Sequence, residues 1–168
     1  MSTENVKKLE LGIDKIYNCE KYLSAESITR EMMQPLIDEG IDLVEKTISS
    51  GEMDVLNRAF DFFNEEYENG ICETLMSFIW QYYSINQIMD VLNHKFNQLI
   101  NNNLMRSVQF FGYCLNAGRF DDMRRLFNTV QAERSTEFLE EFIDWYEEDY
   151  PQEIEILKQD MEKWNSKQ

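Results

Sequence analysis

Residues 49–60 read SSGEMDVLNRAF, and residues 116–127 read NAGRFDDMRRLF. The two stretches align on their glycines without a gap. Met53 with Phe120 and Leu56 with Met123 are apolar in both stretches without being identical. Four positions are identical: Gly51 with Gly118, Asp54 with Asp121, Arg58 with Arg125, and Phe60 with Phe127. The agreement predicts that the chain is built from two copies of one unit.

The flanking segments extend the match in both directions. Upstream, residues 41–51 and 108–118 share an apolar pattern; downstream, after a three-residue contraction, residues 75–83 match residues 139–147. Four consecutive helical patterns therefore recur in the same order, with a period of about 65 residues. This order predicts tandem helical hairpins of the α-solenoid kind behind an N-terminal helix.

The G-x-x-D-x-x-x-x-x-F turn, which starts at Gly51 and again at Gly118, resembles the helix–turn–helix of tetratricopeptide-type and related α-repeats. In such a turn the glycine lets the first helix end in a left-handed conformation, and the aspartate begins the next helix. The resemblance is one of hairpin style, because the chain lacks the W-x-x-L-G pattern and its period differs.

Nearly every segment shows apolar residues at helical spacing. Two prolines and six glycines in 168 residues are too few for an all-β protein. We therefore predict an all-α fold of about eight or nine helices in a single compact domain, residues 1–168. Its parts are an N-terminal helix (1–23), a first repeat (24–100) and a second repeat (101–168). Six residues are predicted to lie in the core: Phe60, Phe78, Ile79, Phe127, Phe142 and Ile143.

Capping and breaking residues predict several helix ends. Pro35 is expected to kink or split the helix around it, since proline lacks a donor and clashes with the preceding turn. Asn69 and Gly70 are expected to end a helix. Ser135 is predicted as an N-cap, and Pro151 as a first helical residue.

The net charge of −16 at pH 7 is the strongest feature of the composition. Because like charges repel, it disfavours nucleic acid and anionic lipid as direct partners. It favours a basic protein, whose encounter it accelerates. The same charge also keeps a small protein soluble, so it bears on partners and not on the fold.

Three features predict a cytoplasmic protein. No apolar run approaches the ~20 residues that a membrane span needs. The first fifteen residues, MSTENVKKLELGIDK, are charged and contain no apolar signal region. Cys19, Cys72 and Cys114 are odd in number and lie among apolar helical positions, which predicts reduced, buried thiols.

The sequence offers few residues for catalysis. His94 is the only histidine, and a lone histidine between Asn93 and Lys95 on a helix is more often structural than catalytic. No zinc, nucleotide, calcium-loop or serine-hydrolase motif occurs. We therefore expect a protein that is not an enzyme and that uses no cofactor and no metal.

Two acidic clusters stand out, and they are predicted to occupy related places in the two copies. No lysine or arginine interrupts the longer one, between Glu137 and Glu155. Like charges one helical turn apart cost a few tenths of a kcal/mol per pair, so a helix selected only for stability would interleave lysines. The predicted partner-binding residues are Asp61, Glu65, Glu66, Glu68, Glu137, Glu140, Glu141, Asp144, Trp145, Glu147, Glu148, Asp149 and Tyr150. A solvated helix face is the alternative interpretation.

The function predicted from these features is that of a non-catalytic inhibitor, an immunity protein or antitoxin whose acidic face blocks a basic, nuclease-like protein. A DNA-mimicking anti-restriction or anti-CRISPR protein would use the same surface, with its acids spaced like duplex phosphates. The third hypothesis is a helical-repeat adaptor that binds a peptide in an apolar or Asn-rich groove, for which the flank near Asn101, Asn102 and Asn103 is the candidate.

Overall fold

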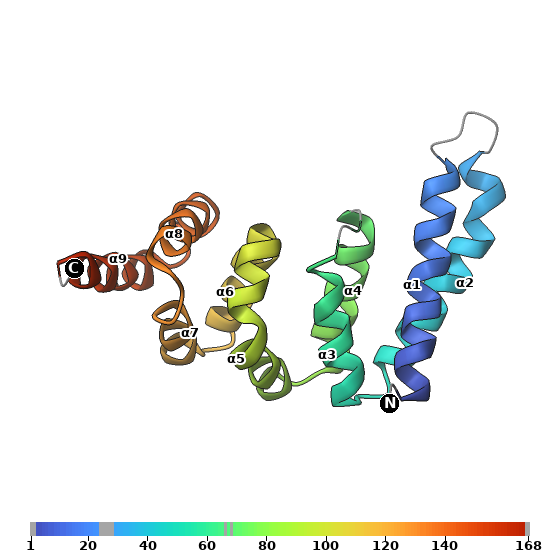
Figure 1. The fold of residues 1–168 in the computed structure, drawn as a ribbon, viewed down its shortest axis with the longest axis horizontal. Coiled ribbons are helices and arrows are strands. Elements are labelled where there is room, and N and C mark those ends of the chain that lie inside the picture. The colour runs from blue at the N-terminus through green and yellow to red at the C-terminus, as the bar shows by residue number, and fades with distance from the viewer. Residues whose placement is uncertain (1–2, 24–28, 66, 68, 167–168) are drawn as a thin grey trace. The chain divides into compact units, whose positions relative to one another are not determined.

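The computed structural model describes residues 3–23, 29–65, 67 and 69–166. Within these ranges it contains nine α-helices and no strand, which confirms the all-α prediction (Figure 1). The helices are α1 (Glu4–Leu23), α2 (Arg30–Ile48), α3 (Met53–Phe62), α4 (Asn69–Tyr82), α5 (Ile85–Asn102), α6 (Leu104–Asn116), α7 (Phe120–Phe127), α8 (Ala132–Tyr146) and α9 (Pro151–Asn165).

Contacts divide the chain into two compact units, Met1–Val91 and Leu92–Gln168. The division falls inside α5, so the first part of this helix belongs to the first unit and the rest to the second. The predicted division at residue 100 and the tandem repeat stay predictions.

The two turn glycines have the backbone conformation that the repeated motif requires. Gly51 follows α2 with a φ of 71°, and Gly118 follows α6 with a φ of 75°. After α6 the Gly118 N–H donates to the Leu115 carbonyl at 2.8 Å, and the Arg119 N–H donates to the Cys114 carbonyl at 2.9 Å. These two bonds form a Schellman motif, which ends α6 and lets α7 begin two residues after the glycine.

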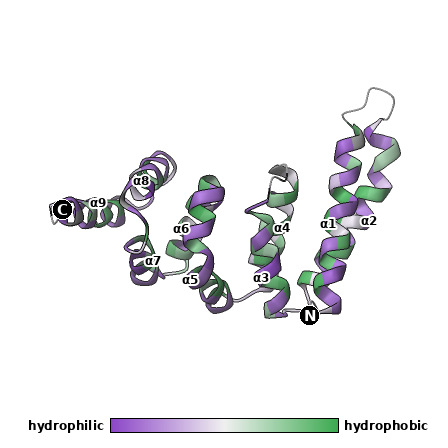
Figure 2. Cartoon of the chain, in the orientation of Figure 1, coloured by the Kyte–Doolittle hydropathy of each residue, from purple (hydrophilic) through white to green (hydrophobic). Residues whose placement is uncertain are grey.

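In the first unit, α1 and α2 lie side by side and run antiparallel (Figure 1). A Cβ built on Gly12 or on Gly40 would lie 3.1 Å from the carbonyl oxygen of the other glycine. The two backbones therefore approach closely at this point, with Ile16 and Val44 buried beside the glycines. Figure 2 shows the apolar residues alternating with polar ones along both helices.

The core of the second unit is an aromatic cluster drawn from four helices. Phe96 of α5, Phe111 of α6, Phe127 of α7 and Phe138 of α8 are all at most 1% exposed. Their ring centroids lie close together, with 5.9 Å between Phe96 and Phe138 and 5.1 Å between Phe111 and Phe138. Burying such large apolar surfaces is the main stabilising contribution available to a unit of this size.

Four of the six predicted core residues are fully buried: Phe60, Ile79, Phe127 and Phe142. Phe78 and Ile143 are only half-buried, although the predicted alignment pairs Phe78 with Phe142. Neighbouring helical residues point about 100° apart, so one of each adjacent pair must lie at the edge of the core.

The burial patterns of α4 and α8 agree best at an offset one residue shorter than the predicted one. The buried residues Leu75, Met76 and Ile79 correspond to Phe138, Leu139 and Phe142, which lie 63 residues later rather than the predicted 64. With this register the exposed positions also coincide along both helices. At this offset the second copy is four residues shorter than the first between the turn glycine and this helix, instead of the three residues that the sequence match indicates.

Several predicted helix ends were wrong, while Pro151 does begin α9. Pro35 does not split its helix, because α2 continues on both sides of it, while a kink there stays a prediction. Asn69 begins α4 instead of ending a helix. Ser135 lies inside α8, where its buried hydroxyl donates to the Gln131 carbonyl at 3.1 Å. Serine makes this bond to the preceding turn as readily as it caps a helix, so its presence alone did not locate the end.

Candidate functional site

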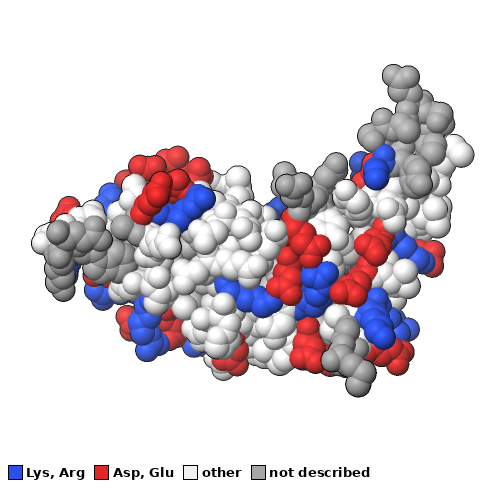
Figure 3. Space-filling model, in the orientation of Figure 1, with Lys and Arg blue, Asp and Glu red and all other residues white. Residues whose placement is uncertain are grey.

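The longer of the two predicted acidic clusters lies on α8 and in the turn after it. We call six of its residues the acidic row: Glu140, Glu141, Asp144, Glu147, Glu148 and Asp149. Five of these residues are exposed and Glu141 is half-exposed. Figure 3 shows acidic side chains gathered over α8, whereas acidic and basic side chains are interspersed over α1 and α3. The acidic row is thus a surface feature of one helix and the turn that follows it.

None of the six residues forms an ion pair with another residue of the described chain. The predicted neighbour Glu137 differs, because it accepts a hydrogen bond from Arg134 one turn earlier. The next two arginines earlier in the chain also have other partners: Arg124 pairs with Asp160, and Arg125 pairs with Asp122. The charge of the row is therefore not neutralised within the part of the chain that the structure describes.

The helix itself ends before the acidic row does. α8 stops at Tyr146, and Glu147, Glu148 and Asp149 lie in the turn before Pro151. These three acids lie at the C-terminal end of α8, where the helix dipole favours cations. Their position costs stability.

The corrected register also shows that the row has no counterpart in the first unit. Glu140 and Asp144 correspond to Ser77 and Gln81 of α4, which are exposed and uncharged. The prediction that the two acidic clusters occupy related places was therefore wrong. A helix in this position of the fold does not require acids on its exposed face.

Of the three aromatic residues beside the row, Trp145, Tyr146 and Tyr150, Trp145 is the one whose side chain is exposed. It is 44% exposed. The Tyr146 ring lies against Gly112, and the Tyr150 hydroxyl lies 3.4 Å from the Gly112 carbonyl. Burial raises the pKa of both tyrosines above its ordinary value. Tyr150, which was predicted to bind the partner, is thus half-buried, and its hydroxyl contacts α6.

The shorter acidic cluster, with Asp61, Glu65, Glu66 and Glu68, contains an acid that is already paired. Glu65 accepts a hydrogen bond from Arg58 at 2.7 Å, and Arg58 also donates to Glu10 of α1 at 2.9 Å. The Arg58 guanidinium lies 4.2 Å from the centre of the Phe62 ring. Asp61 is half-buried. The other two predicted residues, Glu66 and Glu68, lie outside the described residues.

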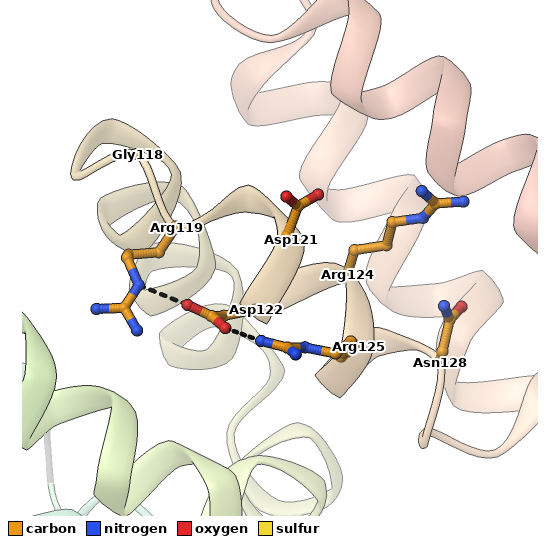
Figure 4. A pocket seen from close by; sticks show the side chains of 7 residues that line it. All are labelled: Gly118, Arg119, Asp121, Asp122, Arg124, Arg125 and Asn128. Carbon is orange, nitrogen blue, oxygen red and sulfur yellow. Dashed lines mark hydrogen bonds and ion pairs between the residues drawn. The ribbon is translucent and has the colours of Figure 1, made fainter.

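A hollow over α7 was not predicted from the sequence (Figure 4). In it, Asp122 lies between Arg119, at 2.5 Å, and Arg125, while Arg124 points away from them. Hydrogen bonding to Arg119 lowers the pKa of the Asp122 carboxyl. Arg124 instead holds Asp160 of α9. Within this hollow, Asp122 is therefore paired with two arginines. The i, i+3 spacing of Asp122 and Arg125 in FDDMRRLF is the signal that could have revealed it.

A second hollow, of about 200 Å³, lies between α5 and the start of α8. We call it the amide hollow; it is lined by Asn97, Asn101, Thr129, Val130, Gln131 and Arg134. The Asn97 amide donates to the Thr129 hydroxyl at 3.5 Å, and that hydroxyl donates to the Leu126 carbonyl at 2.7 Å. Of the asparagines named in the sequence analysis, Asn101 lines the hollow, whereas Asn103 caps α6.

Residues suited to catalysis or metal binding are not brought together. His94 is exposed on α5. In the described residues, no three His, Cys, Asp or Glu side chains are placed to share a metal ion. The cysteines are free and buried, as predicted, and burial raises the pKa of Cys114 to about 12. Nor is any described helix long and apolar enough to cross a bilayer. The predicted absence of enzymatic activity and the cytoplasmic location stay predictions.

Comparison of the chain with protein-family models, with curated proteins and with solved structures gave no match. Function must therefore be argued from the surface itself.

Proposed function

We propose that the chain is a non-catalytic binding protein whose acidic row covers a basic site on another protein, in the manner of an immunity protein or antitoxin that covers a nuclease. One observation supports this function above the others. The row is exposed and lacks ion-pair partners within the described chain, at positions where the corresponding helix α4 carries no charge.

The row has an electrostatic cost in the free protein. Glu140 and Asp144 are one turn apart, as are Glu141 and Asp144, and each such like-charged pair disfavours the helix by roughly 0.2–0.5 kcal/mol. The acids after Tyr146 add an unfavourable interaction with the C-terminal end of the helix dipole. A basic surface placed against the row turns these repulsions into attractions, so the cost in the free protein becomes a gain in the complex.

The charge of the row also affects the rate of association with a partner. Complementary charge raises association rate constants from about 10⁵–10⁶ to as much as 10⁸–10⁹ M⁻¹s⁻¹ at low salt. A neutraliser of a toxic enzyme benefits from this speed, because the enzyme must be captured before it meets its substrate. A nuclease necessarily presents basic residues to its substrate, and an acidic surface competes for those residues.

The test begins with the partner that wild-type protein captures from the cells that express it, identified by mass spectrometry. The association rate constant with that purified partner is then measured for three proteins. They are the wild type, a variant with Glu140, Glu141, Asp144, Glu147 and Glu148 replaced by lysine, and a control with Asp14, Glu31, Asp38, Asp42 and Asp90 replaced by lysine. All ten residues belong to the exposed or half-exposed surface, and both variants change the net charge equally.

We expect the α8 variant to stay folded and to associate at least about a hundredfold more slowly, while the control slows much less. Wild-type association is expected to slow steeply as salt rises, since the Debye length falls to about 8 Å at 0.15 M. Equal slowing of the two variants would mean that only the net charge matters. An unchanged rate for the α8 variant would show that the row is a solvated surface and would overturn the proposal.

A further inference from the structure

The amide hollow continues an uncharged stripe along the exposed side of α5. Asn93, Asn97 and Asn101 are all exposed and lie four residues apart. Residues 91–132 contain only two acidic residues, Asp121 and Asp122, whereas the whole chain contains 32. This stripe therefore offers hydrogen-bonding groups in place of charge. The Asn101 and Gln131 amides have no hydrogen-bond partner in the described chain.

The spacing of the amides matches an extended polypeptide. Four residues of an α-helix advance about 6 Å along its axis. Two residues of an extended strand advance about 6.6 Å, and alternate residues point their N–H and C=O groups to the same side. A side-chain amide carries both donors and an acceptor, so one asparagine can bond both the N–H and the C=O of one residue. Successive asparagines can thus serve every second residue of a strand.

The surroundings of the hollow define the side chains of such a strand. On α8 the hollow adjoins Arg134, whose charge is balanced by Glu137. Glu133, one residue before Arg134, is exposed, and the acidic row begins at Glu140. Residues 133–137 of α8 thus carry two acids and one arginine, a net charge of −1. Basic residues suit this charge, and small polar residues alternating with them leave the main chain of the segment open to the asparagines.

We propose that the stripe Asn93, Asn97 and Asn101, with the amide hollow, holds an extended segment of a protein partner by its main chain. Alternate residues of the segment are bonded through their N–H and C=O groups, and its basic side chains lie toward the acids of α8. The positive charge of those side chains rests on the proposed function. The main-chain contacts rest on the spacing of the asparagines along α5.

The probe is the peptide acetyl-(Thr-Lys)₄-amide with a fluorescent label, compared with an analogue whose four threonine nitrogens are methylated. The two peptides have the same charge, but the analogue lacks the donors that the asparagines would meet. Fluorescence anisotropy at low salt measures both affinities for the full-length protein. We expect the parent peptide to bind about tenfold more tightly than the analogue, the effect of losing two to four net hydrogen bonds of modest strength.

Matched variants test the residues. Asn97→Ala with Asn101→Ala removes two amides of the stripe from exposed positions of α5, where alanine favours the helix. Gln98→Ala with Asn102→Ala is the control, because both residues are exposed on the same helix with the same spacing but do not line the hollow. We expect the first pair to abolish the preference for the parent peptide and the control to keep it.

Three results would overturn the inference: no binding of the parent peptide at millimolar concentration, equal binding of the two peptides to the wild type, or an undiminished preference in the Asn97→Ala, Asn101→Ala variant. Failure of the proposed function looks different. In that case the α8 lysine variant binds both peptides as the wild type does, while the asparagine variant still loses the preference for unmethylated main chain.

Discussion

Gly112 shows how a single residue sets the packing of α6 against α8. A Cβ built on Gly112 would lie 2.5 Å from the Cζ atom of Tyr146, far closer than van der Waals contact. The ring cannot simply retreat, because it also packs on Phe142, with 5.0 Å between the centroids. We expect Gly112→Ala to lower the free energy of unfolding by about 1–3 kcal/mol, as overpacked cores do. Urea denaturation followed by circular dichroism measures the loss.

The control for this prediction is Gly70→Ala. Near the start of α4 the nearest heavy atom to a built Cβ is a carboxylate oxygen of Glu20 at 3.4 Å, so alanine fits. Its better helix propensity is expected to raise stability by up to about 1 kcal/mol. Adding Tyr146→Leu to Gly112→Ala is expected to recover part of the loss. A cost below about 0.5 kcal/mol for Gly112→Ala would mean that the tyrosine ring moves freely.

Asp160 provides a prediction about pH. The carboxylate is buried and accepts two hydrogen bonds from Arg124, at 2.6 and 2.8 Å, which lower the pKa of Asp160. Because the folded pKa lies below the unfolded value of about 3.9, the pair stabilises fully above that pH and loses its contribution as pH falls through the folded pKa. We expect Asp160→Asn to cost about 1–3 kcal/mol at pH 7.

The pH dependence separates this pair from simple loss of packing. As pH falls from about 4 through the lowered folded pKa of Asp160, the stabilities of wild type and Asp160→Asn are expected to converge, since the wild-type carboxyl becomes protonated over that range. Urea denaturation at a series of pH values measures the difference. Glu162→Gln, at an exposed position of the same helix, serves as the control and is expected to change stability by less than about 0.5 kcal/mol at any pH. A constant difference across pH would refute the role of the ion pair.

The sequence could predict residues whose role is local and could not predict those whose role is tertiary. The left-handed turns at Gly51 and Gly118 follow from a motif of a few residues, and the structure contains both. The contact between Gly112 and Tyr146 joins residues 34 positions apart, and nothing in the pattern around Gly112 distinguishes it from an ordinary helical glycine. Ser135 was misassigned because its hydroxyl serves a helix interior as well as a cap.

At the level of the helix, α8 has acidic residues at both ends, although the helix dipole favours them at only one end. Glu133 lies in the first turn, where the helix dipole favours an acid, whereas Glu147 and Glu148 follow the last turn, where it disfavours them. We expect Glu147→Lys with Glu148→Lys to raise the free energy of unfolding by about 0.3–1 kcal/mol per site and to slow association with the partner. Stability and binding would thus change in opposite directions.

Glu133→Lys is the matched substitution at the other end of α8. It is expected to lower stability by a similar amount, and both effects are expected to shrink as salt screens the surface charges. Thermal denaturation at low and high ionic strength measures them. If the two substitutions shift the melting temperature in the same direction, net charge and not the helix dipole determines the stability of α8.

Periodicity predicted the existence of the helices better than their alignment between the two units. The apolar residues of LMSFIWQYY and LEEFIDWYE fit each other at an offset of 64 residues, whereas their burial patterns agree at an offset of 63. Adjacent apolar residues such as Phe78 with Ile79 make the two registers nearly indistinguishable in sequence. The same ambiguity made the two acidic clusters look equivalent, although α4 has uncharged residues where α8 has its row.

On the scale of the whole molecule, the division of the chain differs between sequence and structure. Sequence matching predicts a boundary at residue 100, which leaves α5 with the first repeat. The contacts place the boundary after Val91, so that the second part of α5 joins the second unit. Phe96 belongs to this second part, and its ring lies 6.1 Å from Phe111 and 5.9 Å from Phe138. The aromatic core of the second unit is incomplete without α5.

Two fragments decide between these boundaries. Fragment 85–168 keeps all of α5 and the whole aromatic cluster, and we expect it to be helical and to unfold cooperatively in urea, at lower stability than the intact chain. Fragment 101–168 is the second repeat as predicted from the sequence, and it leaves the faces of Phe111 and Phe138 that Phe96 covers open to water. Deleting a single buried phenylalanine side chain costs about 3–5 kcal/mol, and Leu92, Leu99 and Ile100 are lost with it. Since whole domains have only 5–15 kcal/mol of stability, we expect fragment 101–168 to show no cooperative transition and poorly dispersed amide resonances. Cooperative unfolding of fragment 101–168 at a stability equal to that of 85–168 would place the boundary at residue 100 and make the repeat, not the aromatic cluster, the unit of folding.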